Sequence, residues 1–389
     1  MGRALATALL VLAPLGAAAP SDPLAPQQWH LAEVGAAAAW GGGRGGGVVV
    51  AVLDTGVDLE HPDLRDRLVE GVDLVDEGTV PDDPQGHGTL VAGIIAATAG
   101  NGQGVAGVAP SARLMPVRVL DAEGRGTPAT VAAGIRWAAD HGASVINLSL
   151  ADAVTHDGAG ASGRRGAEGL VDAQVEQAIR AAAEAGVLVV VAAGNDGRDA
   201  VPYREDLPVL VVGATDRSDH VWPRSNRDAR VLFAPGVEIL STWNGGRYAK
   251  ADGTSFAAPI VAAGAAILRG QGLAAGQARA RLVGAAVRVG SGLGRVDLAA
   301  AVTGVPAPPA VSATQPTAPP KPAASAAAPL VIPVPSPSSA PQPVSPEPPA
   351  AITRHRPTGW PVPAMVIGAV LLLVAGGAWI VSRSRSGRG

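Results

Sequence analysis

Three polar side chains in this sequence are suited, as a set, to nucleophilic chemistry: Asp54, His87 and Ser255. A serine hydroxyl is a weak nucleophile, and it needs a base within hydrogen-bond reach, which a histidine supplies. A carboxylate behind the histidine holds the imidazole in the useful tautomer and stabilises the imidazolium that forms. The residue types therefore predict a Ser–His–Asp triad made of Ser255, His87 and Asp54.

Each motif taken alone is a weak signal. Asp54-Thr55-Gly56 is more often a turn than a catalytic site, and an aspartic protease would need a second copy, which the sequence lacks. Ser255 does not lie in a Gly-x-Ser-x-Gly elbow, because Ala257 occupies the last position. The chain order Asp, His, Ser also differs from that of α/β-hydrolases. The prediction depends on finding the three motifs together.

The elements expected to position these residues are strands and helices in alternation. Helical stretches over residues 130–141 and 171–185 separate short apolar runs that are hydrophobic throughout, as strands covered on both faces are. This pattern predicts an α/β fold, a three-layer sandwich with a mostly parallel sheet. The apolar runs are residues 48–53, 114–120, 145–150, 187–192 and 209–212.

The chemical groups follow the ends of these elements. Asp54 comes directly after the first apolar run, and Asn195 comes shortly after the run 187–192. His87 and Ser255 each precede an apolar segment that is expected to be helical. Functional groups collect at the carboxyl ends of the strands in such sheets, so these side chains should meet. The glycines beside His87 and Ser255 are expected to let a substrate backbone approach closely.

The motifs resemble those of a known family. Residues 54–56, 86–93 and 253–259 resemble the three catalytic signatures of the subtilisin-like (subtilase) serine proteases, and residues 193–195 are similar to their oxyanion-hole segment. The resemblance extends over roughly residues 29–300. It implies a subtilisin-like fold, a serine endopeptidase acting on polypeptides, and no required cofactor. It also implies that the Asn195 amide and the Ser255 backbone N–H stabilise the oxyanion.

The same resemblance implies where a substrate lies. Two backbone segments would flank its extended chain and pair with it as added strands. One departure bears on specificity, because the family generally has glycine at position 151 and a methyl group there narrows the cleft. The residues concerned are Ser149, Leu150, Ala151, Ala192, Ala193 and Gly194.

Asp63 and Asn101 resemble positions of a subtilase calcium site. Carboxylate, amide and carbonyl oxygens are the ligands that Ca²⁺ takes in proteins. The alternative is a helix–loop turn that binds no metal. Calcium is thus an optional cofactor of the predicted enzyme.

Both ends of the chain carry targeting signals. Residues 1–19 have the shape of a secretory signal peptide, with a positive start, a short apolar run and small residues after it. An apolar stretch without charges, within residues 360–382, is long enough to cross a bilayer and is framed by tryptophans. The basic tail 383–389 should be cytoplasmic. The sequence predicts a single-pass cell-membrane protein with an extracellular catalytic domain.

Between these ends the composition divides the chain. Residues 20–304 form the predicted peptidase domain, which leaves no room for a typical chaperone prodomain ahead of it. Residues 305–357 are a Pro/Ala-rich linker, expected to be an extended, semi-rigid spacer. The chain has 30 Lys and Arg against 33 Asp and Glu, which argues against a nucleic-acid partner.

The whole layout resembles a mycosin, the membrane-anchored type of subtilase associated with type VII secretion in actinobacteria. That resemblance implies partners in the membrane and in the secretion complex. Mycosins commonly carry disulfides, whereas this sequence has no cysteine. An unaffiliated surface subtilase is the alternative subfamily. A structural subunit of the secretion complex, with peptidase activity secondary, is the alternative function.

Overall fold

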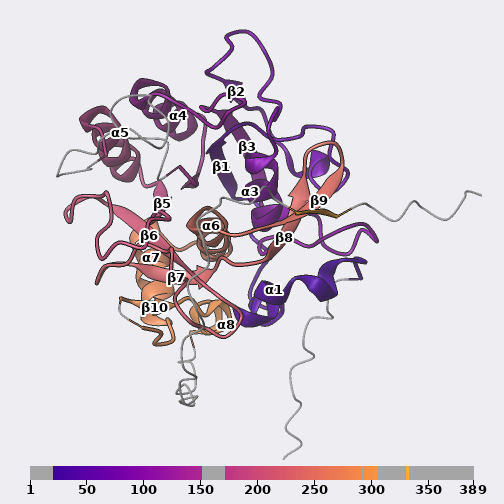
Figure 1. Ribbon diagram of the computed structural model, residues 1–389, viewed down its shortest axis with the longest axis vertical. Coiled ribbons are helices and arrows are strands. Elements are labelled where there is room, and N and C mark those ends of the chain that lie inside the picture. The colour runs from indigo at the N-terminus through magenta and orange to yellow at the C-terminus, as the bar shows by residue number, and fades with distance from the viewer. Residues whose placement is uncertain (1–20, 151–170, 291, 305–329, 333–389) are drawn as a thin grey trace, which may run out of the picture. The chain divides into compact units, whose positions relative to one another are not determined.

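A parallel sheet runs through the computed structural model, which describes residues 21–150, 171–290, 292–304 and 330–332. Its strand order is β10-β7-β6-β5-β4-β1-β3-β2 (Figure 1), and every neighbouring pair is parallel. All five predicted strands are present, so the prediction of an α/β fold with a mostly parallel sheet is confirmed. The strands are β1 (Val49–Asp54), β2 (Val72–Asp73), β3 (Arg113–Arg118), β4 (Val145–Leu148), β5 (Leu188–Ala192), β6 (Val209–Thr215), β7 (Leu232–Pro235) and β10 (Gly294–Arg295).

Helices cover both faces of this sheet. Successive residues of β1 point to opposite sides, so Val52 lies in one hydrophobic core and Leu53 in the other. The core around Leu53 is closed by α4 (Pro128–Asp140) and α5 (Ala173–Glu184). The core around Val52 is closed by α3, α6, α7 and α8 (His87–Ala96, Thr254–Gly270, Ala275–Gly284 and Leu298–Thr303).

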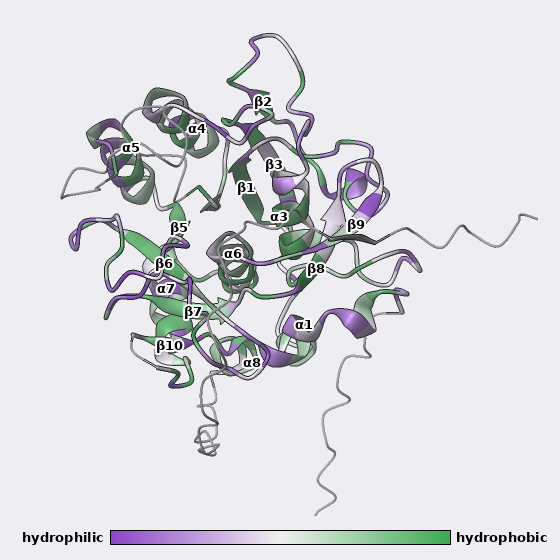
Figure 2. Ribbon diagram, viewed as in Figure 1, coloured by the Kyte–Doolittle hydropathy of each residue, from purple (hydrophilic) through white to green (hydrophobic). Residues whose placement is uncertain are grey.

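The hydropathy of the elements follows these layers. Figure 2 shows hydrophobic colour along β1, β6 and β7 and on α3, whereas α5 carries hydrophilic colour on one side. The helix starts have ordinary causes. Thr127 accepts a hydrogen bond from the Thr130 N–H at the start of α4, and Asp172 accepts one from the Gln174 N–H at the start of α5.

A smaller antiparallel sheet joins the two catalytic helices. Strand β8 (Ile239–Trp243) pairs with β9 (Arg247–Ala251), and β9 leads into α6. The hydroxyl of Ser241 donates to the Leu90 carbonyl of α3 at 2.9 Å, and the hydroxyl of Thr242 donates to the Thr89 carbonyl at 2.6 Å. This hairpin therefore ties the His87 helix to the chain that enters the Ser255 helix.

A third strand, β11 (Leu330–Ile332), lies within the segment predicted as a spacer. It pairs antiparallel with β9, with Val331 opposite Ala249. Its three residues are consecutive and contain no proline, so their N–H groups are free to join a ladder. The spacer is thus paired to the domain at this point.

The segment before β1 belongs to the folded domain. It contains η1 (Ala25–Gln27), α1 (Trp29–Glu33) and α2 (Ala36–Ala39). The Gln28 amide donates to the Ala106 carbonyl at 2.9 Å and accepts from the Ala106 N–H at 2.8 Å. The remaining short helix, η2 (Arg65–Arg67), follows the loop after β1.

The predicted signal peptide, transmembrane segment and basic tail lie outside the described residues. Among the residues that the structure describes, no helix is long and apolar enough to span a bilayer.

His30 in α1 gives the stability of the fold a specific pH dependence. It is fully buried, neither ring nitrogen has a partner among the described residues, and burial lowers its pKa to about 3. Between pH 6.5 and 3 the unfolded chain binds a proton that the folded chain does not, so the free energy of unfolding falls as the pH drops through that window. We expect His30→Leu to reduce the loss between pH 7 and 4 by on the order of 3 kcal/mol, measured by denaturant unfolding.

His220 serves as the control for this experiment, because its side chain is 56% exposed. His220→Leu removes an exposed imidazole in place of the buried one and is measured in parallel. An unchanged dependence in His30→Leu would contradict the assignment.

Candidate active site

The contact between Asp54 and His87 is formed. Asp54 ends β1, is fully buried, and accepts hydrogen bonds at Oδ1 from His87 Nδ1 at 2.7 Å and from the Thr55 N–H at 2.8 Å. His87 is the first residue of α3, and its side chain is 25% exposed. Because Nδ1 carries the proton in this contact, Nε2 of the neutral ring is left as the acceptor.

Gly88 allows this contact to form. A Cβ atom on Gly88 would collide with the Gly56 carbonyl and would lie 3.0 Å from the Asp54 Cβ. Because position 88 is glycine, the loop that follows β1 can pack directly against the start of α3. The sequence prediction had assigned this room to a substrate backbone, and that assignment is wrong for Gly88.

Ser255 lies at the second position of α6, and α6 packs against α3. The ring of Phe256, the next residue, has its centroid 5.2 Å from that of His87, so the two helix starts meet. The Ser255 hydroxyl donates to the Ser149 carbonyl at 3.1 Å. To act with His87, this hydroxyl would have to donate to Nε2 in place of the Ser149 carbonyl.

A proline in α6 explains why Ser149 faces Ser255. Pro259 lies inside the helix and has no N–H, so the Ser255 carbonyl lacks its usual partner four residues on. The Ser149 hydroxyl donates to that carbonyl at 2.8 Å instead. Asn147 in turn donates from its amide to the Ser149 hydroxyl at 2.9 Å. The end of β4 is thereby fastened to the start of the Ser255 helix.

Asn195 is held in one orientation by Thr254. Its side-chain oxygen accepts from the Thr254 N–H at 2.9 Å and from the Thr254 hydroxyl at 3.0 Å. The amide oxygen is therefore occupied, and the NH₂ group is the part left to donate. The Ser255 N–H lies in the first turn of α6, where a helix offers no acceptor. These are the two donors that an oxyanion would need.

The segment that follows β5 is paired within the protein. The carbonyls of residues 192, 193 and 194 accept from the Tyr203 hydroxyl, the Asn226 amide and the Asn226 N–H, at 3.1, 3.1 and 2.8 Å. The Gly194 N–H donates to the Thr254 hydroxyl at 3.1 Å. These groups of Ala192, Ala193 and Gly194 already have partners within the protein, and their pairing with a substrate stays a prediction.

The other predicted substrate segment is only partly described. Ser149 and Leu150 follow β4 and are buried, with 5% and 3% of their surfaces exposed. Ala151 lies outside the described residues.

Comparison of the sequence with known proteins identifies the family to which the chain belongs. The sequence profile of the subtilase family (peptidase S8) matches residues 45–306, which include every element of the site. The chain is a subtilase. The prediction from the three motifs is confirmed at this level.

Individual relatives agree with the profile. Thermitase of Thermoactinomyces vulgaris is 39% identical over 278 residues, which cover 71% of this chain and 94% of thermitase. Subtilisin BL of Lederbergia lenta is 41% identical over 244 residues, 62% of this chain and 83% of that protein. A solved structure of a protease from Pseudoalteromonas arctica has a TM-score of 0.65 and 32% identity, covering 74% of this chain and 99% of its own. The subtilase described here is thus a serine endopeptidase.

The calcium candidates of this subtilase form a hydrogen-bonded cluster. Asp63 is fully buried and accepts from the Asn101 amide at 2.8 Å, the Val105 N–H at 3.0 Å and the Tyr248 hydroxyl at 2.9 Å. Asn101 therefore presents its NH₂ group, not its oxygen, to the carboxylate. Both Asp63 oxygens are satisfied by donors, so the residues as arranged do not fit a calcium ion. Across the described ranges no group of three or more His, Asp or Glu residues could hold a metal.

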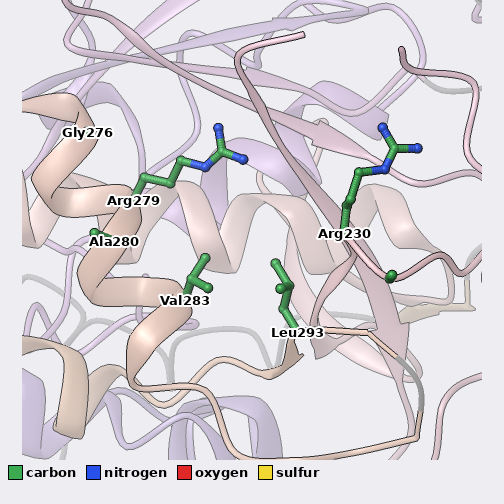
Figure 3. A pocket seen from close by; sticks show the side chains of 7 residues that line it. Arg230, Gly276, Arg279, Ala280, Val283 and Leu293 are labelled. Atoms are coloured by element: carbon green, nitrogen blue, oxygen red, sulfur yellow. The ribbon is translucent and has the colours of Figure 1, made fainter. Parts of the chain in front are cut away.

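A separate pocket of about 340 Å³ is lined by residues of α7 and of the chain on either side of β7. Figure 3 shows Arg279 and Arg230 extending beside it, with Val283 and Leu293 below. Arg230 is held by Asp228 at 2.6 Å. None of the triad residues lines this pocket, so it is distinct from the site at the ends of β1 and β5.

Sequence reasoning missed one buried carboxylate at the site. Asp83 lies four residues before His87 and is only 5% exposed. An acidic residue just ahead of a helix is a known start signal, and it offered the only clue in the sequence.

The pKa of His87 determines where activity is lost on the acid side. Burial is the largest single influence and lowers this pKa, but the charge of Asp54, its hydrogen bond and the charge of Asp83 outweigh it, so the pKa is raised above 6.5. A protonated imidazole cannot act as a base. We therefore expect kcat/KM to fall as the pH decreases through a midpoint above 6.5, measured with a peptide substrate whose own charge is constant. A midpoint at or below 6.5 would contradict this.

Proposed function

We propose that this subtilase is exported, tethered to the outer face of the cell membrane, and cleaves peptide bonds of exported or wall-proximal proteins through Asp54, His87 and Ser255. The observation that carries the catalytic part is the 2.7 Å contact of the buried Asp54 with His87, beside the start of the Ser255 helix. It supports a triad because it leaves the exposed edge of the imidazole as the proton acceptor.

The first chemical step uses the Ser255 hydroxyl, which donates a hydrogen bond to the Ser149 carbonyl in the structure. In the proposal, Ser255 turns from the Ser149 carbonyl to His87, gives its proton to Nε2, and attacks the scissile carbonyl. Asp54 stabilises the imidazolium, which then protonates the leaving amine. Water hydrolyses the acyl-enzyme with His87 acting again as the base.

The oxyanion of each tetrahedral intermediate would be held by the two donors described above. The Asn195 NH₂ group is already oriented by Thr254, so little reorganisation accompanies charge development. The second donor is the Ser255 N–H. The helix dipole of α6 adds positive potential at the same place.

The location rests on sequence features outside the described residues. A secretory signal at residues 1–19 and an apolar span within 360–382 support a single-pass protein whose catalytic domain is extracellular and whose tail 383–389 is cytoplasmic. The resemblance of this layout to mycosins supports a role in type VII secretion, with components of that complex as partners. The alternative role is a structural subunit whose peptidase activity is secondary.

Removal of the nucleophile tests the catalytic proposal. We expect Ser255→Ala to lower kcat by roughly 10⁵–10⁶-fold, because residual catalysis then comes from binding and the oxyanion donors alone. A fluorophosphonate probe should label the wild type at Ser255 and leave the variant unlabelled. Ser218, which lies in an exposed turn, provides the matched control, and Ser218→Ala should keep full activity. Retained turnover in Ser255→Ala would refute the triad.

Complementation of a deletion strain tests the cellular role. We expect Ser255→Ala to fail to restore secretion, and a chain lacking residues 360–382 to be recovered in the medium instead of the membrane fraction. Secretion restored by Ser255→Ala but not by the chain without residues 360–382 would favour the structural role over proteolysis.

A further inference from the structure

Asp83 is a buried carboxylate that receives five hydrogen bonds. Its Oδ1 accepts from the Thr55 hydroxyl at 2.8 Å and from the N–H groups of Gln85 and Gly86 at 2.9 and 2.8 Å. Its Oδ2 accepts from the Thr89 N–H at 2.9 Å and from the Thr89 hydroxyl at 2.6 Å. Both oxygens of this buried carboxylate are therefore paired with donors, as buried polar groups generally are.

These donors come from the two elements that carry the catalytic base and its carboxylate partner. Thr55 directly follows Asp54 at the end of β1, and its hydroxyl oxygen also accepts from the Gly88 N–H at 3.1 Å. Gly86 and Thr89 lie on either side of His87 at the start of α3. Asp83 thus connects the Asp54 loop to the first turn of the His87 helix.

The residue at the start of the helix cannot cap it, and the His87 N–H donates to the Gln85 side-chain oxygen at the longer distance of 3.3 Å. The residue before His87 is Gly86, which has a φ of 111° and no side chain to cap α3. Asp83 supplies the acceptors that a capping side chain would, and it places a negative charge at the positive end of the helix. Fixing the first turn fixes the backbone from which His87 projects.

We propose that Asp83 is a positioning residue for the catalytic base: its carboxylate holds the start of α3 against the Asp54 loop and faces the His87 imidazole as a second negative charge. In this role Asp83 touches neither substrate nor the reacting atoms. The inference rests on the triad proposed above.

The charges around His87 agree with this geometry. Asp54 faces the imidazole from β1, Asp83 from the turn before α3, and both carboxylates raise its pKa against the effect of burial. From α6 the ring of Phe256 lies beside the imidazole, and it carries no charge. Removing the charge of Asp83 should therefore lower the pKa of His87 while Asp54 remains in contact.

The test is the dependence of kcat/KM on pH in the full-length protein. On the acid side of this profile, kcat/KM falls as His87 is protonated, and we call this fall the acid limb. We expect Asp83→Asn to move the midpoint of the acid limb to lower pH by about half to one unit, because one of the two carboxylates near the imidazolium is lost. We also expect the plateau of kcat to fall by about 10- to 100-fold, because an amide cannot accept from all five donors. A purely structural role would lower the plateau without moving the limb.

Two variants separate charge from position. Thr55→Val removes the hydroxyl that links Asp83 to Gly88 but keeps the charge, so it should lower the plateau and leave the limb in place. Asp82→Asn removes the adjacent, exposed carboxylate and should change neither. If Asp83→Asn does not fold, judged by its melting temperature, Thr55→Val carries the test of position, and full activity in that variant overturns the proposal.

Fluorophosphonate labelling in the same preparations distinguishes the two ways to fail. Wild-type protein that is not labelled at Ser255 overturns the triad. Labelled wild type, together with an unmoved acid limb in Asp83→Asn or an equal shift in Asp82→Asn, overturns the role of Asp83 alone.

Discussion

Buried carboxylates must be neutralised or surrounded by donors, and this requirement shapes the site more than any other. Asp54 ends a strand whose other residues face two hydrophobic cores, so its charge depends on the Thr55 N–H and on the imidazole of His87. Asp83 meets the same requirement with five donors from the turn, the helix start and Thr55. Both carboxylates bond to Thr55, and through it and His87 they connect β1 to the start of α3.

The serine side of the site follows a similar logic with uncharged groups. Pro259 removes one hydrogen bond from α6, and the vacancy at the Ser255 carbonyl is filled by a hydroxyl from the end of β4. Thr254 uses its N–H and its hydroxyl to hold Asn195. Each side chain that would act on substrate is therefore oriented by a neighbouring side chain that does not itself contact the substrate in the proposal. Enzymes hold reactive groups in place in this way, so that little reorganisation is needed during the reaction.

The sequence was sufficient to predict five strands of the parallel sheet and the pairing of Asp54 with His87, and the reasons are physical. Runs such as residues 187–192 are apolar at every position because both faces of the strand are covered, so they stand out by composition alone. The hairpin β8–β9 was missed because its inward-facing Ser241 and Thr242 look like surface residues until their hydroxyls are seen on the carbonyls of α3. Asp83 and the pairing of residues 192–194 depend on partners brought near only by folding. No local pattern encodes such contacts.

The short ladder between β11 and β9 has a mechanical consequence. Tension applied to the chain beyond residue 332 would load these few backbone hydrogen bonds before it reached α8. Strand β9 leads into α6, whose second residue is Ser255, so such a pull would act on the strand leading to Ser255. In the membrane-tethered arrangement proposed above, the spacer would accordingly be counted from Ile332 and not from the end of the peptidase domain, which would shorten the reach of the enzyme from the membrane.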